Sequence, residues 1–395
     1  MSRLPLEAET RYPFEEISQG LQARQLWENV FAEYKEILPG EIKYLYTGIG
    51  EAPAENEVIS VNKMGDTSKI ARYIDLKAEF STIPKILFLI ASPLLSDDVI
   101  NLRSVARHYK EQGVDKVVAV MTTLAHERQD HTFNDDQGNP ILEATILKEI
   151  VGTLSGFDLV DKKTNYYRRP IDAALLIQPH SLRPVEFGLR EDFPILPLDA
   201  MDFLIDRANL VSIANPFVLG PDKGRRDEAR RIASVLQCEQ ESLSKKRDRL
   251  NGGRPSIYFS PQLLQRLKEG DYTVICADDE IREGGTYGEI TNGLKDIPIV
   301  ICAVKMIAAQ RDGVTAIDHL NKPNVRKIFI TDAVKPQNDL APLADRMEVI
   351  PIGLELEKII DYLKNKLSDP GNPDWLDPSE TGTLIHLDLT PEIYA

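Results

Sequence analysis

An acidic strand end followed by two glycines and a threonine is the part of this sequence best suited to chemistry. The apolar run Val274-Ile-Cys-Ala leads directly into Asp278, Asp279 and Glu280, and Gly284-Gly-Thr286 follows. In open α/β sheets ligands bind at the carboxyl ends of strands, and the amides at a helix N-terminus hold anions such as phosphate. Neighbouring carboxylates can hold sugar hydroxyls or a hydrated magnesium ion. The pattern indicates a site for an anion such as phosphate, with a sugar or a magnesium ion beside it, and its alternative is an ordinary acidic turn with a Gly-Gly bend.

The elements that would position this segment alternate between short apolar runs and amphipathic stretches. One helix should open at the N-cap cluster Ser96-Asp-Asp98 and stop near Gly113. Alternation of this kind favours mostly parallel sheets with helices on both faces. We therefore predict an α/β protein of two doubly wound domains, residues 1–197 and 198–367. The expected strands are 85–91, 116–121, 173–177, 210–214, 272–277, 298–304, 327–331 and 349–352, and the further helices are 140–154, 222–236, 287–294 and 354–367.

Two stretches do not fit the alternation. Residues 240–255 are dense in charge and lack apolar periodicity, which predicts a mobile loop. Residues 368–395 contain Pro370, Pro373, Pro378 and Pro391 and should form an extended tail that docks weakly or on a partner subunit.

Composition limits the classes of function. The chain has 395 residues and a net charge of −15, which works against binding nucleic acid because phosphate contacts need clustered Lys and Arg. No apolar run is long enough to cross a membrane, and the polar start Met1–Tyr12 lacks a signal segment. Cys238, Cys276 and Cys302 lie far apart, as is usual in a reducing compartment. We expect a soluble cytoplasmic protein without a nucleic-acid or membrane partner.

Four segments, in order along the chain, resemble the motifs of the ribose-phosphate diphosphokinases, a family with the phosphoribosyltransferase-like fold. Asp278–Thr286 is similar to their phosphoribosyl-binding motif, and Glu127-Arg-Gln-Asp130 to their Ala-Arg-Gln-Asp segment. Gly220-Pro-Asp-Lys-Gly224 is similar to their Pro-Asp-x-Gly turn, and Ser244-Lys-Lys-Arg247 stands where they have a mobile Lys-x-Arg catalytic loop. The resemblance covers roughly residues 58–367 and implies two phosphoribosyltransferase-like domains.

The resemblance implies an enzyme that transfers the β,γ-diphosphate of ATP to the anomeric hydroxyl of ribose 5-phosphate with Mg²⁺, giving phosphoribosyl diphosphate (PRPP) and AMP. It also implies a homo-oligomer that acts on small molecules. The implied site residues are catalytic (Lys245, Arg247), nucleotide-binding (Arg128, Gln129, Asp66), acceptor-binding (Asp278, Asp279, Arg282, Glu283, Gly284, Gly285, Thr286) and metal-binding (His180, Asp222). Without the other motifs, Lys245 and Arg247 would belong to a solvated basic loop, and Arg128 and Gln129 to a surface ion pair with Asp130.

The phosphate loop departs from the family motif at Glu283, which replaces a threonine. At about 4 Å and an effective dielectric near 20, a carboxylate would repel one unit of phosphate charge by about 4 kcal/mol. Either Glu283 points away and Arg282 supplies the phosphate contact, or the acceptor carries less charge there. A phosphodiester, as in ADP-ribose, would carry one charge fewer.

Three further departures affect the other contacts. Gln178 replaces the aspartate of an Asp-x-His motif, so His180 loses its expected anionic partner, and a metal role competes with a capping or core role. Lys305 ends Ala303-Val-Lys305, where the family has Ala-Thr-His. Met64-Gly-Asp-Thr67 stands for a Phe-x-Asp-Gly-Glu nucleotide segment, so the adenine pocket is rebuilt or weaker.

Four hypotheses remain. The first is synthesis of PRPP from ribose 5-phosphate, and the second is the same chemistry on a nucleotide-linked ribose such as ADP-ribose. The third is a catalytically silent regulatory homologue, which would not need the residues of the transfer loop. A phosphoribosyltransferase is the fourth and weakest, because the domain pair and the Lys-x-Arg loop favour the kinase.

Overall fold

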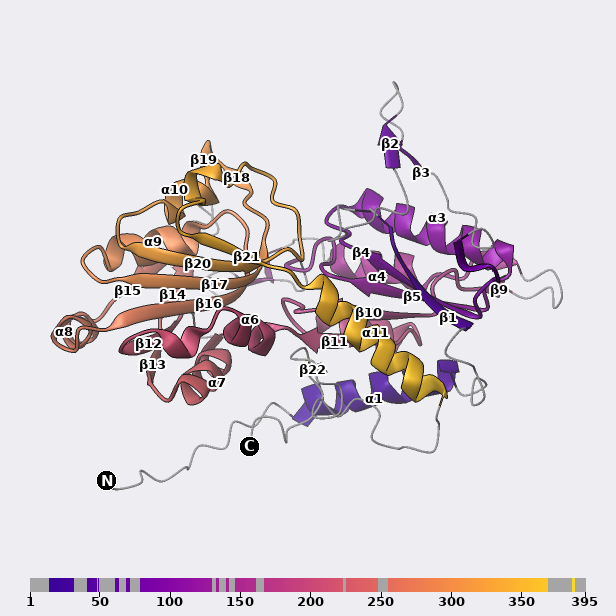
Figure 1. The fold of residues 1–395 in the computed structure, drawn as a ribbon, viewed down its shortest axis with the longest axis horizontal. Helices are drawn as coiled ribbons and strands as arrows, with labels where there is room; N and C mark the ends of the chain where they lie inside the picture. Colours follow the sequence, from indigo (N-terminus) through magenta and orange to yellow (C-terminus); the bar gives the residue numbers. More distant parts are fainter. Residues whose placement is uncertain are drawn as a thin grey trace.

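The computed structural model describes residues 14–31, 41–47, 49, 61–63, 69–71, 79–129, 133–134, 140–141, 146–160, 167–222, 225–247, 255–368 and 386–387. Within these residues the chain forms two α/β halves that lie side by side (Figure 1). Each half is built on a six-stranded sheet. The predicted fold class, with mostly parallel sheets and helices around them, is confirmed.

The sheet of the first half has the strand order β1-β4-β5-β10-β11-β22. Its pairs are parallel except the last, between β11 and β22. Every residue of β4 is buried, as expected for a parallel strand covered on both faces. The strands are β1 (Ile42–Tyr46), β4 (Ile86–Ala91), β5 (Lys116–Met121), β10 (Ala173–Ile177), β11 (Ile195–Asp199) and β22 (His386–Leu387).

The sheet of the second half has the order β13-β12-β16-β17-β20-β21 and is parallel throughout. Its two central strands, β16 and β17, are long and begin with apolar runs, and β17 is buried at every position. The strands are β12 (Pro216–Gly220), β13 (Glu239–Ser242), β16 (Thr273–Ile281), β17 (Ile299–Met306), β20 (Val325–Thr331) and β21 (Met347–Ile350).

Helices cover the sheets and begin and end at recognisable signals. In α3, the Asp98 carboxylate accepts a hydrogen bond from the Leu95 amide at 3.0 Å, and the helix stops at Gly113, whose φ of 111° is left-handed. The described helices are α1 (Phe14–Phe31), α3 (Ser96–Gln112), α4 (Ile146–Ser155), α5 (Arg183–Arg190), α6 (Met201–Arg207), α7 (Arg226–Leu236), α8 (Pro261–Glu269), α9 (Gly285–Gly293), α10 (Ala316–Leu320) and α11 (Gly353–Ser368), with 3₁₀ turns η3 (Leu210–Ser212) and η5 (Ala341–Leu343).

The two sheets face each other with the carboxyl ends of their strands. The hydroxyls of Ser92, after β4, and Thr122, after β5, both donate to the carbonyl of Ala333, which follows β20. Farther along the same boundary, residues that follow β5 and β10 contact residues of β16 and β17. Because parallel sheets bind ligands at these ends, the boundary is the natural place for a shared site.

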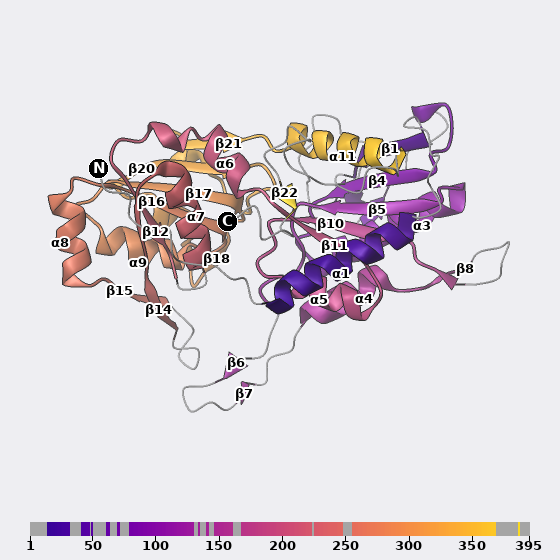
Figure 2. The ribbon, with the colours of Figure 1, turned by 90° about the horizontal axis from the view of Figure 1, so that it is seen from below.

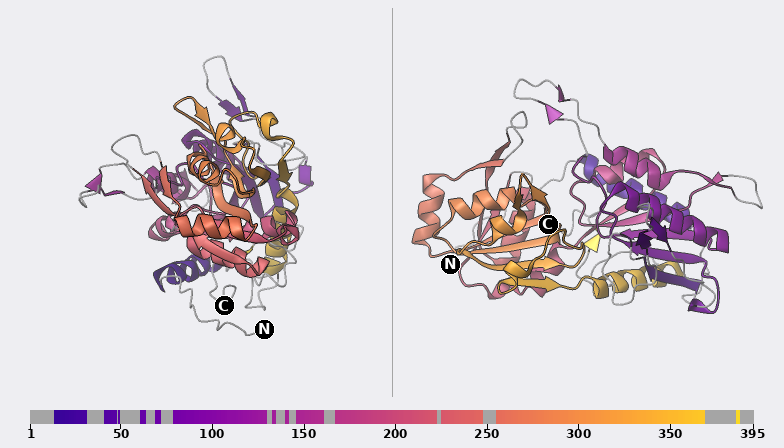
Figure 3. Two further views of the ribbon diagram at one scale, coloured as in Figure 1. Left: turned by 90° about the vertical axis from the view of Figure 1, so that its left-hand side faces the viewer. Right: turned by 90° about the horizontal axis from the view of Figure 1, so that it is seen from above.

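Short antiparallel ribbons extend from both halves. The ribbon β6 (Phe133–Asn134) with β7 (Pro140–Ile141) and the ribbon β14 (Ser244–Arg247) with β15 (Pro255–Tyr258) project on the same side of the molecule (Figures 2 and 3). The other ribbons are β2 (Val61–Lys63) with β3 (Lys69–Ala71), β8 (Leu159–Val160) with β9 (Tyr167–Arg168), and β18 (Gln310–Arg311) with β19 (Val314–Thr315).

Three local predictions are wrong. Residues 210–214 were expected as a strand, but they contain the 3₁₀ turn η3, and β12 begins only at Pro216. The helix predicted from residue 140 begins at Ile146, because Pro140 and Ile141 pair with a strand instead. The loop predicted over 240–255 contains most of β13, all of β14 and the first residue of β15.

The end of the described chain returns to the first half. Leu356, Ile359, Ile360 and Leu363 of α11 belong to the core that contains the first sheet, and α11 lies beside that half in Figure 1. In the predicted tail, β22 pairs with Leu198 and Asp199 of β11. The proposed domain limits at 197 and 367 stay a prediction. In the part of the chain described, no helix combines the length and the apolar character that a membrane span requires.

Candidate functional site

The acidic end of β16 lies buried where the two sheets meet. Val274 and Cys276 pack into the core of the second half, while Ile275 and Ala277 pack into the core shared with the first. Because successive side chains point to opposite faces of the sheet, both faces of this strand are buried and its position is well defined. The next two residues are Asp278 and Asp279, whose side chains are 17% and 3% exposed. Buried carboxylates are costly without partners.

The partner of both carboxylates is Arg225, just before α7. Its Nε lies 3.2 Å from Asp278 Oδ1, one of its Nη atoms contacts Asp279, and the other lies 3.5 Å from Glu228 Oε2. Burial lowers the pKa of Arg225, but the carboxylates of Asp279, Glu228 and Asp278 outweigh burial and raise it above its usual value. Sequence reasoning misses Arg225, whose only signal is its position directly after the Gly220–Gly224 turn.

The first half contributes His180, which follows β10. Its Nδ1 lies 2.8 Å from Asp279 Oδ2. Gln178 indeed supplies no negative charge, and its amide oxygen instead accepts a hydrogen bond from Ala200 N at 2.8 Å. The expectation that the ring lacks an anionic partner is wrong, because the carboxylate comes from the other half of the molecule.

The two aspartates differ in their ionisation. Burial raises the pKa of Asp278 well above its usual range, and the neighbouring Asp279 raises it further. Burial acts in the same direction on Asp279, but Arg225 and His180 outweigh it and hold its pKa well below the usual range. Asp279 is therefore the carboxylate that stays ionised, and Asp278 is the one that burial drives towards its protonated form.

Glu280 joins two further predicted residues. Arg282 Nε lies 2.8 Å from Glu280 Oε1, and Arg282 Nη2 lies 3.3 Å from Oε2. From the first half, Arg128 Nη1 approaches Glu280 Oε1 at 3.9 Å. Gln129, next to Arg128, contacts the ring nitrogen Nδ1 of His126 at 2.8 Å. The guanidinium of Arg282 is thus held by the strand end that precedes the phosphate loop.

The predicted phosphate loop forms the start of α9. Gly284 has a left-handed φ of 74°, and a Cβ at this position would lie 2.8 Å from the Cα of Ala316, so a side chain is excluded on both grounds. Gly285 and Thr286 occupy the first turn of the helix, where backbone amides lack partners within the helix. This end of α9 can hold an anion, with the half-buried Glu283 just before it.

The remaining predicted residues are described only in part. Lys245 and Arg247 lie on β14, paired with β15, and only their backbone is described. Asp222 helps to raise the pKa of Arg225, so its carboxylate belongs to the same cluster. Asp66 lies outside the described residues. Among those described, no group of three or more His, Cys, Asp or Glu side chains is placed to hold a metal ion.

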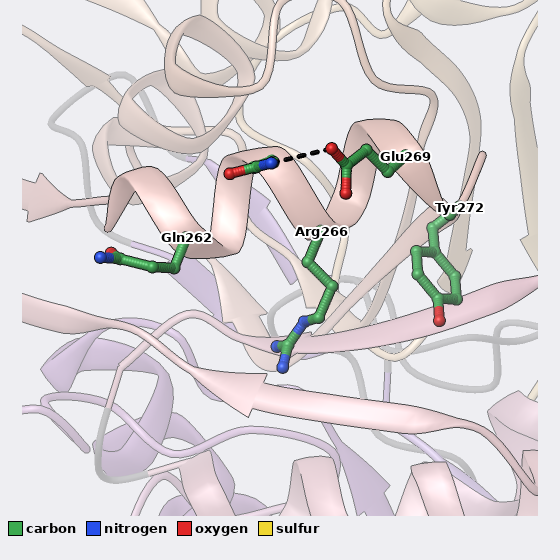
Figure 4. A pocket seen from close by; sticks show the side chains of 6 residues that line it. Gln262, Arg266, Glu269 and Tyr272 are labelled. Carbon is green, nitrogen blue, oxygen red and sulfur yellow. Dashed lines mark hydrogen bonds between the residues drawn. The ribbon is translucent and has the colours of Figure 1, made fainter.

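A shallow depression on α8 lies apart from this cluster (Figure 4). Its polar groups pair among themselves and with β13: Gln265 donates to Glu269 at 2.8 Å, and Arg266 donates to Glu241 at 2.6 Å. None of the predicted site residues lines it. Its lining consists of Gln262, Gln265, Arg266, Glu269, Gly270 and Tyr272.

Comparison with known proteins finds similar proteins by sequence and by fold. Over 61% of its length the chain is 25% identical to a ribose-phosphate pyrophosphokinase of Sulfolobus acidocaldarius, 73% of which is covered. Over 75% of its length it is 26% identical to a protein of the same name from Pyrococcus furiosus, 90% of which is covered. The fold is similar to the crystal structure of phosphoribosylpyrophosphate synthetase from Mycobacterium smegmatis, with a TM-score of 0.58, 15% identity, and 82% of this chain and 99% of that one covered. No model of a known protein family matches the chain.

Proposed function

The chain is a divergent relative of the ribose-phosphate diphosphokinases, and from this premise we propose that it transfers the β,γ-diphosphate of ATP to the anomeric hydroxyl of a phosphorylated ribose. The default acceptor is ribose 5-phosphate, which would give PRPP and AMP. One observation carries the proposal. The segments that correspond to the nucleotide and acceptor motifs come from different halves of the chain, and they meet through Arg128, His180, Asp279 and Glu280.

The proposed roles follow from charge and position. Asp279, ionised and buried, would accept hydrogen bonds from ribose hydroxyls together with Asp278. The amides at the start of α9, with Thr286, would hold the acceptor phosphate. Arg128, Gln129 and Asp66 would contact the nucleotide.

Transfer itself would depend on positioning and on neutralisation of charge. Phosphoryl-transfer enzymes gain most of their rate in these two ways. Lys245 and Arg247 would close over the phosphates from the β14–β15 ribbon and stabilise the charge that develops on them.

Magnesium is the proposed metal ion beside this cluster of carboxylates. Mg²⁺ is usually bound by one or two carboxylates together with waters and substrate phosphates, so it needs no complete protein cage. Asp222, whose carboxylate is close enough to Arg225 to raise its pKa, is the proposed ligand. His180, which contacts Asp279, would lie at the same site. When bound, the ion would neutralise charge on the phosphate oxygens.

A second acceptor is favoured by one observation. Arg282 makes two contacts with Glu280, and the carboxylates of Glu280 and Glu283 both raise its pKa, so its single positive charge is shared between them and compensates Glu283 only in part. An acceptor with one charge fewer at this position, such as the diphosphate-linked ribose of ADP-ribose, would meet less repulsion. The same diphosphokinase chemistry would then give ADP-ribose 1-diphosphate.

The test is release of AMP from ATP and magnesium with either ribose 5-phosphate or ADP-ribose. AMP with ribose 5-phosphate would support a divergent PRPP synthetase, and AMP with ADP-ribose alone would support the second acceptor. Removal of magnesium by EDTA is expected to abolish release. No AMP with either acceptor would refute the transferase and favour a silent regulatory homologue that binds nucleotide.

A further inference from the structure

A completely buried ion pair joins the two halves next to the proposed site. Lys305 Nζ, on β17 of the second half, lies 2.9 Å from Glu127 Oε2 and 3.1 Å from Oε1. Glu127 follows β5 in the first half. The two side chains are 1% and 0% exposed, for Glu127 and Lys305 respectively. Two charges are taken out of water here, which is favourable only if every remaining hydrogen-bonding position is also used.

The carboxylate of Glu127 does use them. Its Oε1 accepts from the amide of Leu124, and its Oε2 accepts from the amide of His180 at 3.1 Å. Burial raises the pKa of Glu127, and the charge of Lys305 opposes this effect. One buried carboxylate is therefore bonded to the loop after β5, to the segment after β10 and to β17 in the other sheet.

Each of these three attachments lies beside a residue of the proposed site. Arg128 follows Glu127 in the chain and approaches Glu280. The backbone amide of His180 is held by Glu127, while its ring contacts Asp279. Lys305 is the register partner of Glu280 in the pairing of β17 with β16. A shift at the ion pair would therefore move nucleotide-side and acceptor-side residues relative to each other.

Both residues of the pair also depart from the motifs that the chain otherwise resembles. Glu127 stands where the Ala-Arg-Gln-Asp segment has alanine, and Lys305 stands where Ala-Thr-His has histidine. These two departures lie far apart in the sequence, and the sequence alone gives no sign that they are related. In the structure they are partners of one another.

We propose that Glu127 and Lys305 are positioning residues that hold the Arg128–Gln129 segment and the His180 segment in register with the acidic end of β16. Both side chains are buried, so their proposed effect on substrate is through the residues that they hold. The proposal rests on the proposed function for its kinetic consequence, whereas its structural consequence can be measured without any activity.

The structural test is hydrogen–deuterium exchange of the full chain carrying Lys305→Met. Amides in residues 122–129 and 178–182 are expected to exchange at least about tenfold faster, because they lose a carboxylate held in place from the other sheet. The matched control is Lys110→Met, which breaks another buried ion pair, with Asp172 at 2.5 Å, inside the first half. The control should speed exchange near residues 115–117 and 172 and leave both test segments unchanged. Unchanged exchange in both test segments of Lys305→Met would overturn the proposal.

The kinetic test separates positioning from a loss of folded protein. At a temperature at which every variant is folded, Lys305→Met and Glu127→Gln are expected to raise KM for ATP and for the acceptor by about tenfold, whereas Lys110→Met raises neither. Faster exchange with unchanged KM values would reject the positioning role. If the unaltered chain releases no AMP, the proposed function fails. The exchange comparison alone then tests whether the ion pair holds the two segments in place.

A double variant guards against failure of a single one to fold. Glu127→Gln/Lys305→Met leaves no buried unpaired charge, so its unfolding midpoint is expected to lie closer to that of the unaltered chain than either single variant. If the double variant is destabilised by the full sum of the two single effects, Glu127 and Lys305 are not energetically coupled, and the proposed role of their ion pair is wrong.

Discussion

Glu228 provides a measurable test of the charge cluster around Arg225. It lies on α7 with its side chain 11% exposed, and Arg225 Nη1 approaches it at 3.5 Å. Arg225 is shared with Asp278 and Asp279, so Glu228 receives only part of its charge. Burial, together with the negative charges of Asp199 and Asp279, raises the pKa of Glu228 from 4.5 to about 6 despite Arg225 and Arg231. We predict that Glu228→Gln stabilises the protein at neutral pH.

The sign and size follow from proton linkage. Because the pKa is higher in the folded state, folding is favoured by protonation of Glu228, and this contribution is complete below about pH 4.5 and lost as the pH rises through about 6. The difference of about 1.5 between the two pKa values corresponds to about 2 kcal/mol at pH 7.5. From pH 5 to pH 7.5, the free energy of unfolding of Glu228→Gln should therefore rise by about 1 kcal/mol relative to that of the unaltered chain.

The assay is urea unfolding followed by circular dichroism at several pH values between 5 and 8. Glu269→Gln, which removes a carboxylate at an exposed position on α8, is the control with which the pH dependence of Glu228→Gln is compared. A difference between Glu228→Gln and the unaltered chain that is constant across this range would refute the reasoning. It would mean that Glu228 is as well solvated or as well paired in the folded state as in the unfolded one.

The other predictions concern the proposed transfer. Lys245→Ala should lower kcat by about a thousandfold or more and leave the Kd for ATP nearly unchanged, because the loop would act on the transition state; an unchanged kcat would remove the loop from the mechanism. Asp279→Asn should raise the acceptor KM by about tenfold, since an amide holds two ribose hydroxyls poorly, and unchanged acceptor affinity would count against this role. Glu283→Thr should raise kcat/KM for ribose 5-phosphate by about tenfold or more, because repulsion of the phosphate is removed, and no gain would reject selection by Glu283.

The sheets could be predicted because their strands are short, continuous apolar runs. Residues 85–91 and 298–304 match β4 and β17 closely, since a strand covered on both faces must be apolar along its whole length. The run at 210–214 misled for the same reason, because a few apolar residues can equally form one buried turn. Asn209 and Asn215 bound that run with left-handed φ values of 49° and 47°, which only the structure reveals.

Polar strands escaped prediction because their stability comes from pairing at a distance. β13 reads Glu-Gln-Glu-Ser and β14 reads Ser-Lys-Lys-Arg, and neither has an apolar face. β13 is the outer strand beside β12, and β14 is held by β15 across the residues between them. Local sequence carries no record of such partners, which explains why residues 240–255 resembled a loop.

For the site, too, the sequence predicted individual residues but not the contacts between them. The motifs identified Asp278, Asp279, His180 and Arg128 one by one, because each belongs to a recognisable segment. Their contacts with one another depend on how the two sheets face each other, and a motif contains no information on that arrangement. Arg225 lies outside the recognised motifs, although it makes the main ionic contacts with Asp278 and Asp279.

The charge of the acidic pair bears directly on the choice of acceptor. Asp279 stays ionised beside Arg225, while burial shifts Asp278 towards its protonated form, so the two aspartates and the arginine together are close to neutral. A carboxylate offers about four lone-pair positions, so the contacts with Arg225 and His180 leave room on Asp279 for a sugar hydroxyl. An anionic acceptor would therefore meet little repulsion from these two aspartates. In the phosphate loop, the negative charge of Glu283 is compensated only in part, because Arg282 is shared between Glu280 and Glu283. It follows that selection between a phosphate monoester and a phosphodiester should reside in this one side chain, and that exchange of Glu283 for threonine should alter acceptor preference without altering how the ribose is held.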